Sequence, residues 1–149
     1  MKKYITQNEF QNLNRTLINK LDGHKFDFIL GIRNGGLNVS TPVAAQFNMP
    51  HHSIRISFYD QEQRLLKPII DDWDKIEFLK SKKNFLWVDD IIDSGSTLRW
   101  FIENTGLKLN KDFKVATLHW CKENSPDLEP TFYVEIKVET TLEKFIQFK

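Results

Sequence analysis

One stretch of the chain gathers side chains that could hold a phosphorylated sugar. It begins with two adjacent carboxylates, Asp89 and Asp90, and passes through two apolar residues to a third carboxylate, Asp93. Four small residues follow: Ser94, Gly95, Ser96 and Thr97. The glycine lets backbone N–H groups approach an anion, and the hydroxyls add hydrogen-bond donors. The paired carboxylates suit sugar hydroxyls or a hydrated Mg²⁺, so this stretch favours a phosphorylated ribose as its ligand.

The flanking segments would position these residues at the end of a strand and the start of a helix. Apolar residues 84–88 favour a buried strand that runs directly into the acidic pair, and residues 96–104 favour a helix closed by Gly106. Such a helix would direct its first N–H groups and the positive end of its dipole at a phosphate. Neither a P-loop nor a dinucleotide fingerprint occurs in the chain. The simpler alternative is a helix N-cap beside ordinary loop acids.

The rest of the chain alternates helices and strands. Thr6 and Glu9 have the capping-box spacing before an amphipathic helix over residues 7–21, and a second helix is expected after residues 34–36. Further strands are expected over residues 26–32, 53–57, 115–120 and 131–134. This alternation predicts an α/β fold, a mostly parallel twisted sheet flanked by helices. Ligands of such sheets bind beyond the carboxyl ends of the strands.

Residues 59–83 differ from their surroundings, because they are crowded with charge and carry only a broken apolar pattern. We expect a long loop there, with one short helix over residues 72–79. A loop of this length inside a compact domain is usually functional or disordered.

Length, charge and cysteine content restrict the class of protein. The 149 residues suit one core, so we expect a single domain over residues 1–149. A formal net charge of +1 provides no global field toward nucleic acid or an anionic membrane. Cys121 is the one cysteine, which excludes an internal disulfide, and no apolar run approaches the length of a spanning helix. We expect a cytoplasmic protein that binds neither nucleic acid nor membranes.

Residues 89–97 resemble the motif that binds 5-phosphoribosyl 1-diphosphate (PRPP) in type I phosphoribosyltransferases. That motif is an apolar strand, two acids, two apolar residues and then Asp-Thr-Gly-x-Thr, with Ser94 here in place of the first threonine. The resemblance implies that residues 93–97 hold the 5-phosphate. It implies that Asp89 and Asp90 bind ribose hydroxyls, directly or through Mg²⁺. It also gives Asp93 the role of accepting the proton that leaves the base, although from the residues alone Asp93 could equally cap the helix.

The resemblance extends to a second loop. Residues 29–37 are similar to the family's first loop, where a Gly-Gly turn holds pyrophosphate through backbone amides. It implies pyrophosphate contacts from four residues: Arg33, Asn34, Gly35 and Gly36. The family usually has an arginine directly before the two glycines, whereas this chain has its arginine one place earlier. Taken alone, the Asn-Gly pair is typical of an ordinary turn.

Within that family the chain most resembles the short bacterial xanthine–guanine phosphoribosyltransferases. Residues 57–60 resemble the start of their mobile loop, which covers residues 59–83 here, and a small C-terminal hood is expected. Lys122 matches the lysine that contacts the purine 6-oxo group, and Thr141 stands where those enzymes place an aromatic residue over the base. The resemblance implies transfer of phosphoribosyl from PRPP to guanine, xanthine or hypoxanthine in purine salvage. It also implies Mg²⁺ as cofactor and assembly into a dimer or tetramer.

Two other functions stay open. A PRPP-binding regulatory protein would keep the sugar-phosphate site without catalysis, and the threonine at position 141 favours it. The near-zero net charge and the lack of a recognisable DNA-binding segment count against it. A phosphoribosyltransferase for a different base is the second alternative.

Overall fold

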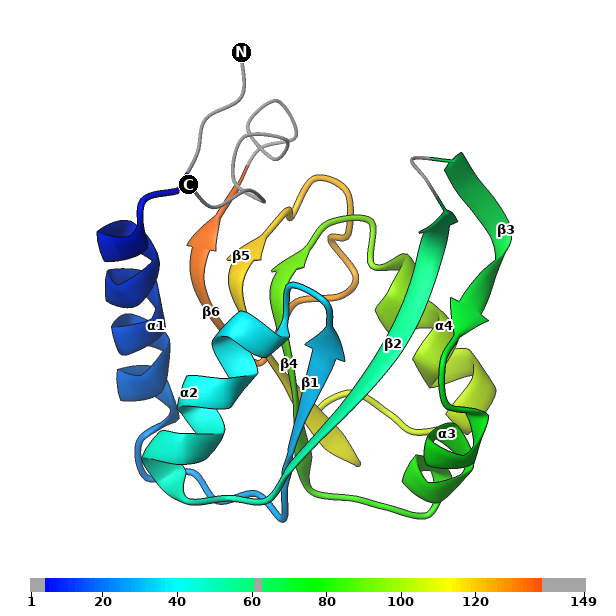
Figure 1. Ribbon diagram of the computed structural model, residues 1–149, viewed down its shortest axis with the longest axis horizontal. Helices are drawn as coiled ribbons and strands as arrows, with labels where there is room; N and C mark the ends of the chain where they lie inside the picture. The colour runs from blue at the N-terminus through cyan, green and yellow to red at the C-terminus, as the bar shows by residue number, and fades with distance from the viewer. Residues whose placement is uncertain (1–4, 61–62, 138–149) are drawn as a thin grey trace.

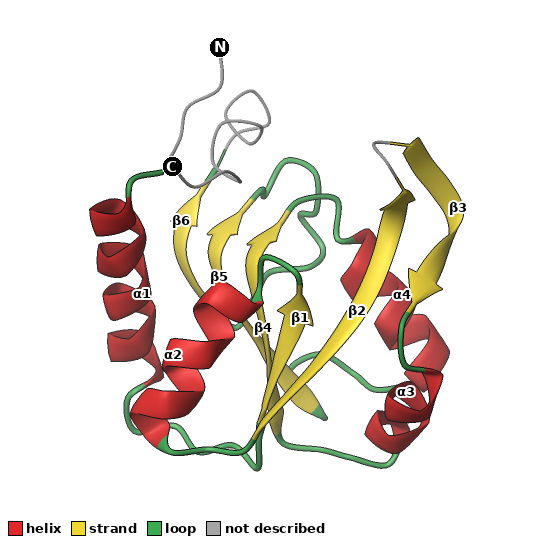
Figure 2. Cartoon of the chain, viewed as in Figure 1, coloured by secondary structure: helices red, strands yellow, loops and turns green. Residues whose placement is uncertain are grey.

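The computed structural model describes residues 5–60 and 63–137 as one sheet between two layers of helices (Figures 1 and 2). In chain order the elements are α1 (Gln7–Leu21), β1 (Ile29–Arg33), α2 (Leu37–Phe47), β2 (His51–Asp60), β3 (Gln63–Ile70), α3 (Trp73–Lys80), β4 (Phe85–Ile92), α4 (Ser96–Thr105), β5 (Phe113–Trp120) and β6 (Phe132–Ile136). The strand order is β3-β2-β1-β4-β5-β6. Only β2 and β3 are antiparallel among these strands, and the other neighbours are parallel. The expected α/β class with a mostly parallel sheet is confirmed.

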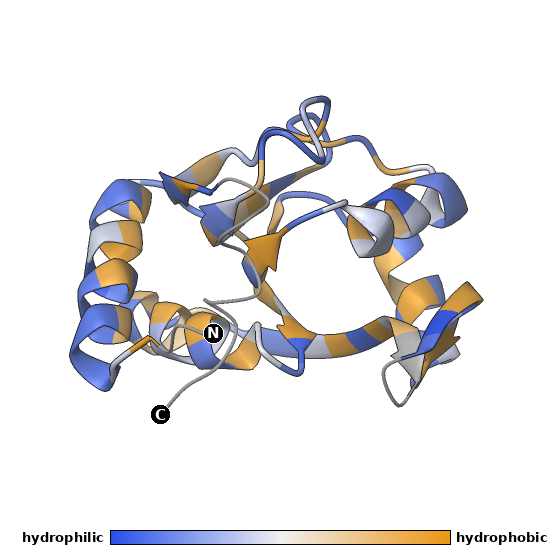
Figure 3. Cartoon of the chain, turned by 90° about the horizontal axis from the view of Figure 1, so that it is seen from above, coloured by the Kyte–Doolittle hydropathy of each residue, from blue (hydrophilic) through white to orange (hydrophobic). Residues whose placement is uncertain are grey.

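The first helix forms where the capping-box spacing predicts it. The hydroxyl of Thr6 accepts a hydrogen bond from the Glu9 N–H at 3.1 Å and donates to the Glu9 carboxylate at 3.2 Å. Phe10, Leu17 and Leu21 are buried on the face toward the sheet. Figure 3 shows the hydrophilic residues of this helix on the outer side. A satisfied N-terminus and one apolar stripe therefore account for both the position and the orientation of α1.

Each face of the sheet has its own core. Helices α1 and α2 pack on one face through buried residues such as Leu17 and Val43, together with Val88 and Leu118 of the sheet. Helices α3 and α4 cover the other face through residues such as Leu79 and Phe101. The central strands are thus buried on both sides, which explains why their sequences read as continuous apolar runs.

Stacked aromatic rings fix the amino-terminal edge of the three central strands. Phe28 immediately precedes β1, and Phe85 and Phe113 begin β4 and β5. The Phe85 ring stacks on both others, with centroids 5.1 Å apart and planes 10° from parallel in each pair. Phe101 of α4 meets Phe113 edge-on at 5.6 Å. These contacts join strands and helix at the edge opposite the loops that follow the strands.

The structure differs from the expected loop over residues 59–83. β2 continues to Asp60, and β3 pairs with it antiparallel to form the β2–β3 arm, with an irregular register between Ser57 and Tyr59. Helix α3 then starts one residue later than expected, because Asp72 serves as its N-cap and accepts from the Lys75 N–H at 3.0 Å. Most of β3 is exposed, so backbone pairing and not side-chain alternation defines this strand. The mobility of the segment stays a prediction.

Several expectations fall outside what the structure describes. Thr141 lies within residues 138–149, which are not among the described residues, and the C-terminal hood stays a prediction. The single domain over residues 1–149 stays a prediction. No helix within residues 5–60 and 63–137 has both the length and the apolar character needed to span a bilayer.

Candidate functional site

Two loops meet at the carboxyl edge of the sheet, where the strand order reverses direction. From β1 the chain crosses through α2 to β2, and from β4 it crosses through α4 to β5 on the other side. The loops after β1 and β4 are therefore neighbours, as at the ligand-binding crevice of open α/β sheets. A Cβ added at Gly35 would overlap the Asp90 carboxylate, and one added at Gly36 would overlap the backbone oxygen of Ile32. Close approach of the two loops thus accounts for Gly35, and the tight turn of the chain against its own strand accounts for Gly36.

The loop after β4 turns sharply into α4 and forms a cradle, residues 94–97. Gly95 has φ +78°, a left-handed conformation that favours glycine, and is the N-cap of α4 without a side-chain cap. The hydroxyls of Ser94 and Ser96 lie 2.8 Å apart, and the Thr97 hydroxyl donates to the Ile56 carbonyl of β2 at 3.3 Å. The Ser96 N–H donates to the Ser94 hydroxyl at 3.3 Å, while the glycine at the N-cap has no side chain to bond the N–H groups that follow. A helix N-terminus of this kind beside two hydroxyls is suited to bind a phosphate.

Two adjoining cavities lie over these loops. The cradle cavity, of about 350 Å³, is lined by residues 93–98 together with Phe58, Arg64 and Asp89. The turn cavity, of about 470 Å³, is lined by residues 32–35 together with Asp89 and Asp90. Ile56, Asp89, Ile91 and Thr97 line both. The structure therefore brings the two predicted anion-binding loops to either end of one continuous depression, with the acidic pair between them.

The acidic pair has the electrostatics of a cation site. Burial at the strand end raises the pKa of Asp89 well above its usual value, and the neighbouring Asp90 carboxylate raises it further. A bound cation would relieve this repulsion. Among the described residues, no group of three or more His, Cys, Asp and Glu side chains could hold a metal. Asp89 and Asp90 both line the turn cavity, and two carboxylates suit Mg²⁺, because this ion keeps several waters and takes phosphate oxygens from substrate.

The β5–β6 connector, residues 121–131, braces the cradle from outside. Arg99 of α4 pairs with both carboxylate oxygens of Asp127 at 2.6 and 2.7 Å and donates from Nε to the Ser94 carbonyl at 3.2 Å. This pairing lowers the pKa of Asp127 to about 2. A Cβ at Gly95 would overlap the Leu128 side chain, so the connector also covers the glycine of the cradle. The sequence carried no signal for these contacts, because the partners are far apart along the chain.

Asp93 is held by the same connector and does not cap α4. Its Oδ1 accepts a hydrogen bond from the side-chain amide of Asn124 at 2.6 Å. Gly95 occupies the N-cap position, and it is the Ser94 hydroxyl that accepts a hydrogen bond from the Ser96 N–H at 3.3 Å. The alternative in which Asp93 is simply a helix cap is therefore wrong in this structure. Asp93 is one of the residues that line the cradle cavity.

The sequence over residues 3–148 matches the family model described as the phosphoribosyl transferase domain. The chain belongs to this family. The match spans both loops and the whole described sheet, so the family assignment and the geometry of the cavities concern the same part of the chain.

Solved structures of similar fold include purine phosphoribosyltransferases. This phosphoribosyl transferase domain is similar to a purine phosphoribosyltransferase from Pyrococcus horikoshii, with a TM-score of 0.72 and 29% identity over 99% of this chain and 91% of that one. A xanthine-guanine-hypoxanthine phosphoribosyltransferase from Helicobacter pylori shares the fold at 0.66 and 17% identity, covering 96% of each chain. A Neisseria gonorrhoeae protein with bound ppGpp does so at 0.65 and 21%, over 93% and 89%. No curated protein shows a significant match.

Two arginines of the phosphoribosyl transferase domain have contacts that the sequence did not predict. Arg64, at the start of β3, donates to the Ser96 hydroxyl at 3.1 Å and lines the cradle cavity. Arg33 lines the turn cavity and donates to Asp71, at the end of the arm, at 3.1 Å. The peptide bond between Arg33 and Asn34 is cis. The arm thus contacts both anion-binding loops through charged side chains.

Lys122 is not among the residues that line either cavity. It is exposed on the β5–β6 connector, two residues after the end of β5 and two residues before Asn124. Its predicted contact with a base stays a prediction.

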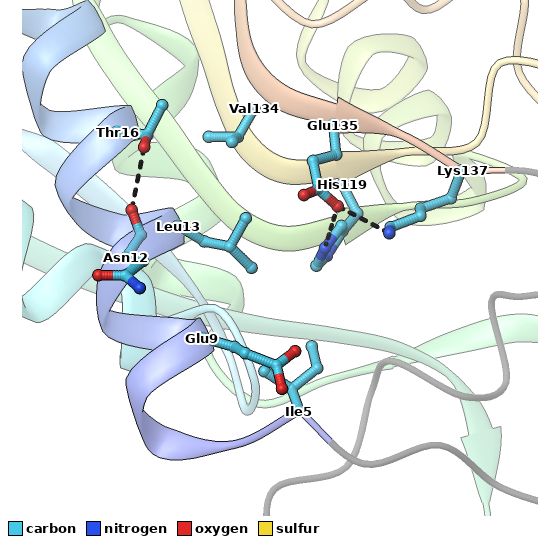
Figure 4. A pocket seen from close by; sticks show the side chains of 9 residues that line it. All are labelled: Ile5, Glu9, Asn12, Leu13, Thr16, His119, Val134, Glu135 and Lys137. Atoms are coloured by element: carbon cyan, nitrogen blue, oxygen red, sulfur yellow. Dashed lines mark hydrogen bonds and ion pairs between the residues drawn. The ribbon is translucent and has the colours of Figure 1, made fainter.

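A third cavity of the phosphoribosyl transferase domain lies between α1 and the last two strands and shares no residue with the other two (Figure 4). His119, Glu135 and Lys137 lie together at one side of it, with Glu135 3.5 Å from the His119 ring and 2.7 Å from the Lys137 ammonium. Burial and the positive charge of Lys137 lower the pKa of His119 to about 4, although the negative charges of Glu135 and Asp90 act to raise it. His119 is therefore neutral at pH 7.

This histidine makes the stability of the domain depend on pH. The pKa of His119 falls from 6.5 in the unfolded chain to about 4 in the folded one, so between these values only the unfolded chain binds the proton. Stability should fall as pH drops through this window, by up to about 3 kcal/mol, since each pH unit contributes about 1.4 kcal/mol. Urea unfolding at several pH values should show a smaller loss for His119→Gln than for the wild type. Equal pH dependence in both proteins would contradict the assignment.

Proposed function

We propose that the protein transfers the 5-phosphoribosyl group of PRPP to a 6-oxopurine and releases pyrophosphate, as an enzyme of purine salvage. The observation that carries the proposal is the pair of adjoining cavities with Asp89 between them. One cavity ends in a helix N-terminus with glycine as its N-cap and the other in a Gly-Gly turn, so the pair suits a sugar with phosphate groups at both ends. Membership of the phosphoribosyl transferase domain family supports the same substrate.

PRPP would lie along the carboxyl edge of the sheet. Its 5-phosphate would bind at residues 93–97, where it would exchange the present hydrogen bonds of the Ser94, Ser96 and Thr97 hydroxyls for bonds to its oxygens and accept from the first N–H groups of α4. Its ribose hydroxyls would face Asp89 and Asp90, and its pyrophosphate would lie against residues 33–36, of which 33–35 line the cavity and Gly36 is the N-cap of α2. This arrangement holds both charged ends of the substrate, so that C1 of the sugar has a fixed position.

Asp89 and Asp90 are also the residues that would hold Mg²⁺. Bound there, the ion would supply positive charge that stabilises the departing pyrophosphate. The two carboxylates fit the ion because they leave coordination positions for water and for substrate oxygens.

The proposed reaction needs no covalent bond between the substrate and the protein. A ring nitrogen of the base forms a bond to C1 while the bond from C1 to the pyrophosphate oxygen breaks, with inversion at C1. The proton released from N7 of the purine would pass to the Asp93 carboxylate, which lines the cradle cavity. Aligning the two substrates and placing charge at the leaving group would account for most of the rate.

The preference for a 6-oxopurine rests on Lys122. Its ammonium can only donate hydrogen bonds, so it would favour the 6-oxo group of guanine, xanthine or hypoxanthine over the amino group of adenine. We further expect assembly into a dimer or tetramer and a cytoplasmic location. Light scattering of the purified protein measures the former.

Activity with a panel of bases tests the proposed function. Purified protein would be incubated with Mg²⁺ and PRPP, separately with guanine, xanthine, hypoxanthine, adenine, uracil and orotate, and pyrophosphate and nucleotide would be measured. Turnover with a 6-oxopurine supports the proposal, and turnover only with another base discards the role of Lys122. Tight PRPP binding without turnover on any base supports the regulatory alternative. Neither binding nor turnover contradicts the PRPP site itself.

Arg64 should contribute to PRPP affinity. Its guanidinium contacts Ser96 and adds positive charge to the cavity proposed for the 5-phosphate. We expect Arg64→Gln to raise the KM for PRPP by about three- to tenfold with little change in kcat, since a charge-assisted contact at a part-exposed site is of modest strength. Lys67→Gln is the matched control, because Lys67 is an exposed cation of the same strand and lines neither cavity. Equal KM values for the two variants would contradict this role.

A further inference from the structure

We propose that Asn124 is a positioning residue that holds the Asp93 carboxylate in place to receive the proton of the base. The inference rests on the proposed function, because it concerns the proton-transfer step of that reaction. The two side chains are 31 positions apart in the sequence, yet the Asn124 amide donates to Asp93 Oδ1 at 2.6 Å. An amide side chain does not titrate, so it can hold a carboxylate without competing for the proton that the carboxylate must accept.

Asn124 is well suited to this role because hydrogen bonds to buried residues hold the turn on which it lies. The backbone N–H groups of Asn124 and Ser125 both lie 3.2 Å from the Cys121 carbonyl, and the Ser125 hydroxyl donates to the same carbonyl at 3.0 Å. The indole N–H of Trp120 lies 3.2 Å from both oxygens of Ser125. Trp120, Cys121 and Ser125 are all buried. The amide therefore projects from a rigid turn and restricts rotation of the Asp93 carboxylate.

The hydrogen bond from Asn124 also determines which oxygen of the Asp93 carboxylate would accept the proton of the base. With Oδ1 engaged by Asn124, Oδ2 is the oxygen left to take the proton. The same turn carries Lys122, the residue proposed to contact the 6-oxo group. On a purine, that group and N7 lie on one edge of the ring system. A single rigid turn would thus set the position of both protein groups that face this edge.

Kinetics of single and double variants test the inference. With saturating PRPP and guanine, we expect Asn124→Ala to lower kcat about tenfold, while the KM for PRPP and its affinity by calorimetry stay within about twofold. If Asn124 acts through the carboxylate of Asp93, adding Asn124→Ala to Asp93→Asn should lower kcat no further. Glu123→Ala, an exposed neighbour in the same turn, is the control and should behave as the wild type.

A second variant gives a readout that a purely structural role would not move. Asn124→Asp replaces the donor with a carboxylate, which repels Asp93 and should lower kcat more than Asn124→Ala does. Two facing carboxylates hold a shared proton at a pH above the ordinary Asp value of about 4. When the introduced group carries that proton it is again a donor, so kcat of this variant relative to the wild type should rise as pH falls from 7 to 5. Thermal unfolding checks that every variant is folded.

The outcomes separate the inference from the proposed function. A kcat of Asn124→Ala equal to that of the wild type overturns the inference and leaves the proposed function intact. Full additivity of Asn124→Ala with Asp93→Asn does the same, because the amide would then act independently of the carboxylate. Absence of turnover by the wild type with every base overturns the proposed function, and the inference with it.

Discussion

The Asp93→Ala variant is expected to turn over PRPP and guanine at least about a hundredfold more slowly than the wild type. Asp93 lines the cradle cavity and would be the group that accepts the proton from the base. Within residues 93–97 the hydrogen-bond donors to the 5-phosphate are the N–H groups and hydroxyls of residues 94–97, which the substitution leaves in place, so PRPP affinity should be nearly unchanged. Steady-state rates and calorimetric PRPP titration measure the two effects separately.

Two further variants distinguish the loss of a proton acceptor from a general disturbance of the loop. Asp93→Asn keeps the size of the side chain but cannot accept the proton, so it should be nearly as slow as Asp93→Ala. Glu129→Ala, which removes another exposed carboxylate from the β5–β6 connector, should retain full activity. If turnover survives in Asp93→Ala, the assignment of this residue as the proton acceptor is wrong.

Replacing Gly95 with valine should abolish PRPP binding. The backbone there has φ +78°, which is strained for any L side chain and most of all for a β-branched one. The added Cβ would also overlap Leu128 of the connector. Relief of both problems requires the cradle to move, which displaces the N–H groups at the start of α4 from the phosphate position. Calorimetry with PRPP and Mg²⁺ measures the loss.

Gly106 supplies a matched control at the other end of the same helix. It has φ +75°, and an added Cβ there would meet nothing within 4 Å. Gly106→Val therefore introduces similar backbone strain, about 1–2 kcal/mol, without touching the cradle. It should lose stability but bind PRPP normally. Normal PRPP binding by Gly95→Val would remove the argument that residues 94–97 form a phosphate site.

Local patterns predicted the elements whose signals are local. The helix over residues 7–21 has a capping box and one apolar stripe, and the structure gives it the same bounds. β4 carries a buried apolar run directly into Asp89, and α4 begins at the expected Ser96. Such elements can be predicted because side-chain periodicity and caps act within a few residues.

Other features depend on partners far away in the sequence. β3 is exposed on both faces and is a strand because β2 pairs with it, so no alternation of side chains could indicate it. The contacts of Asn124 with Asp93 and of Arg64 with Ser96 join residues separated by about thirty positions. The sequence indicated which residues could bind phosphate and sugar. The side chains that hold them in place became visible only in the folded chain.

The stacked phenyl rings at the amino ends of the central strands have a consequence for how such a protein can change over time. Phe28, Phe85 and Phe113 tie the sheet together at one edge, whereas every loop considered for binding leaves the opposite edge. Substitutions in those loops therefore spare the contacts that join the strands. The sheet and its packing can therefore be kept while the loops change the ligand that they bind. Solved structures that keep this fold at 29% and 17% identity illustrate how far the sequence can diverge around it.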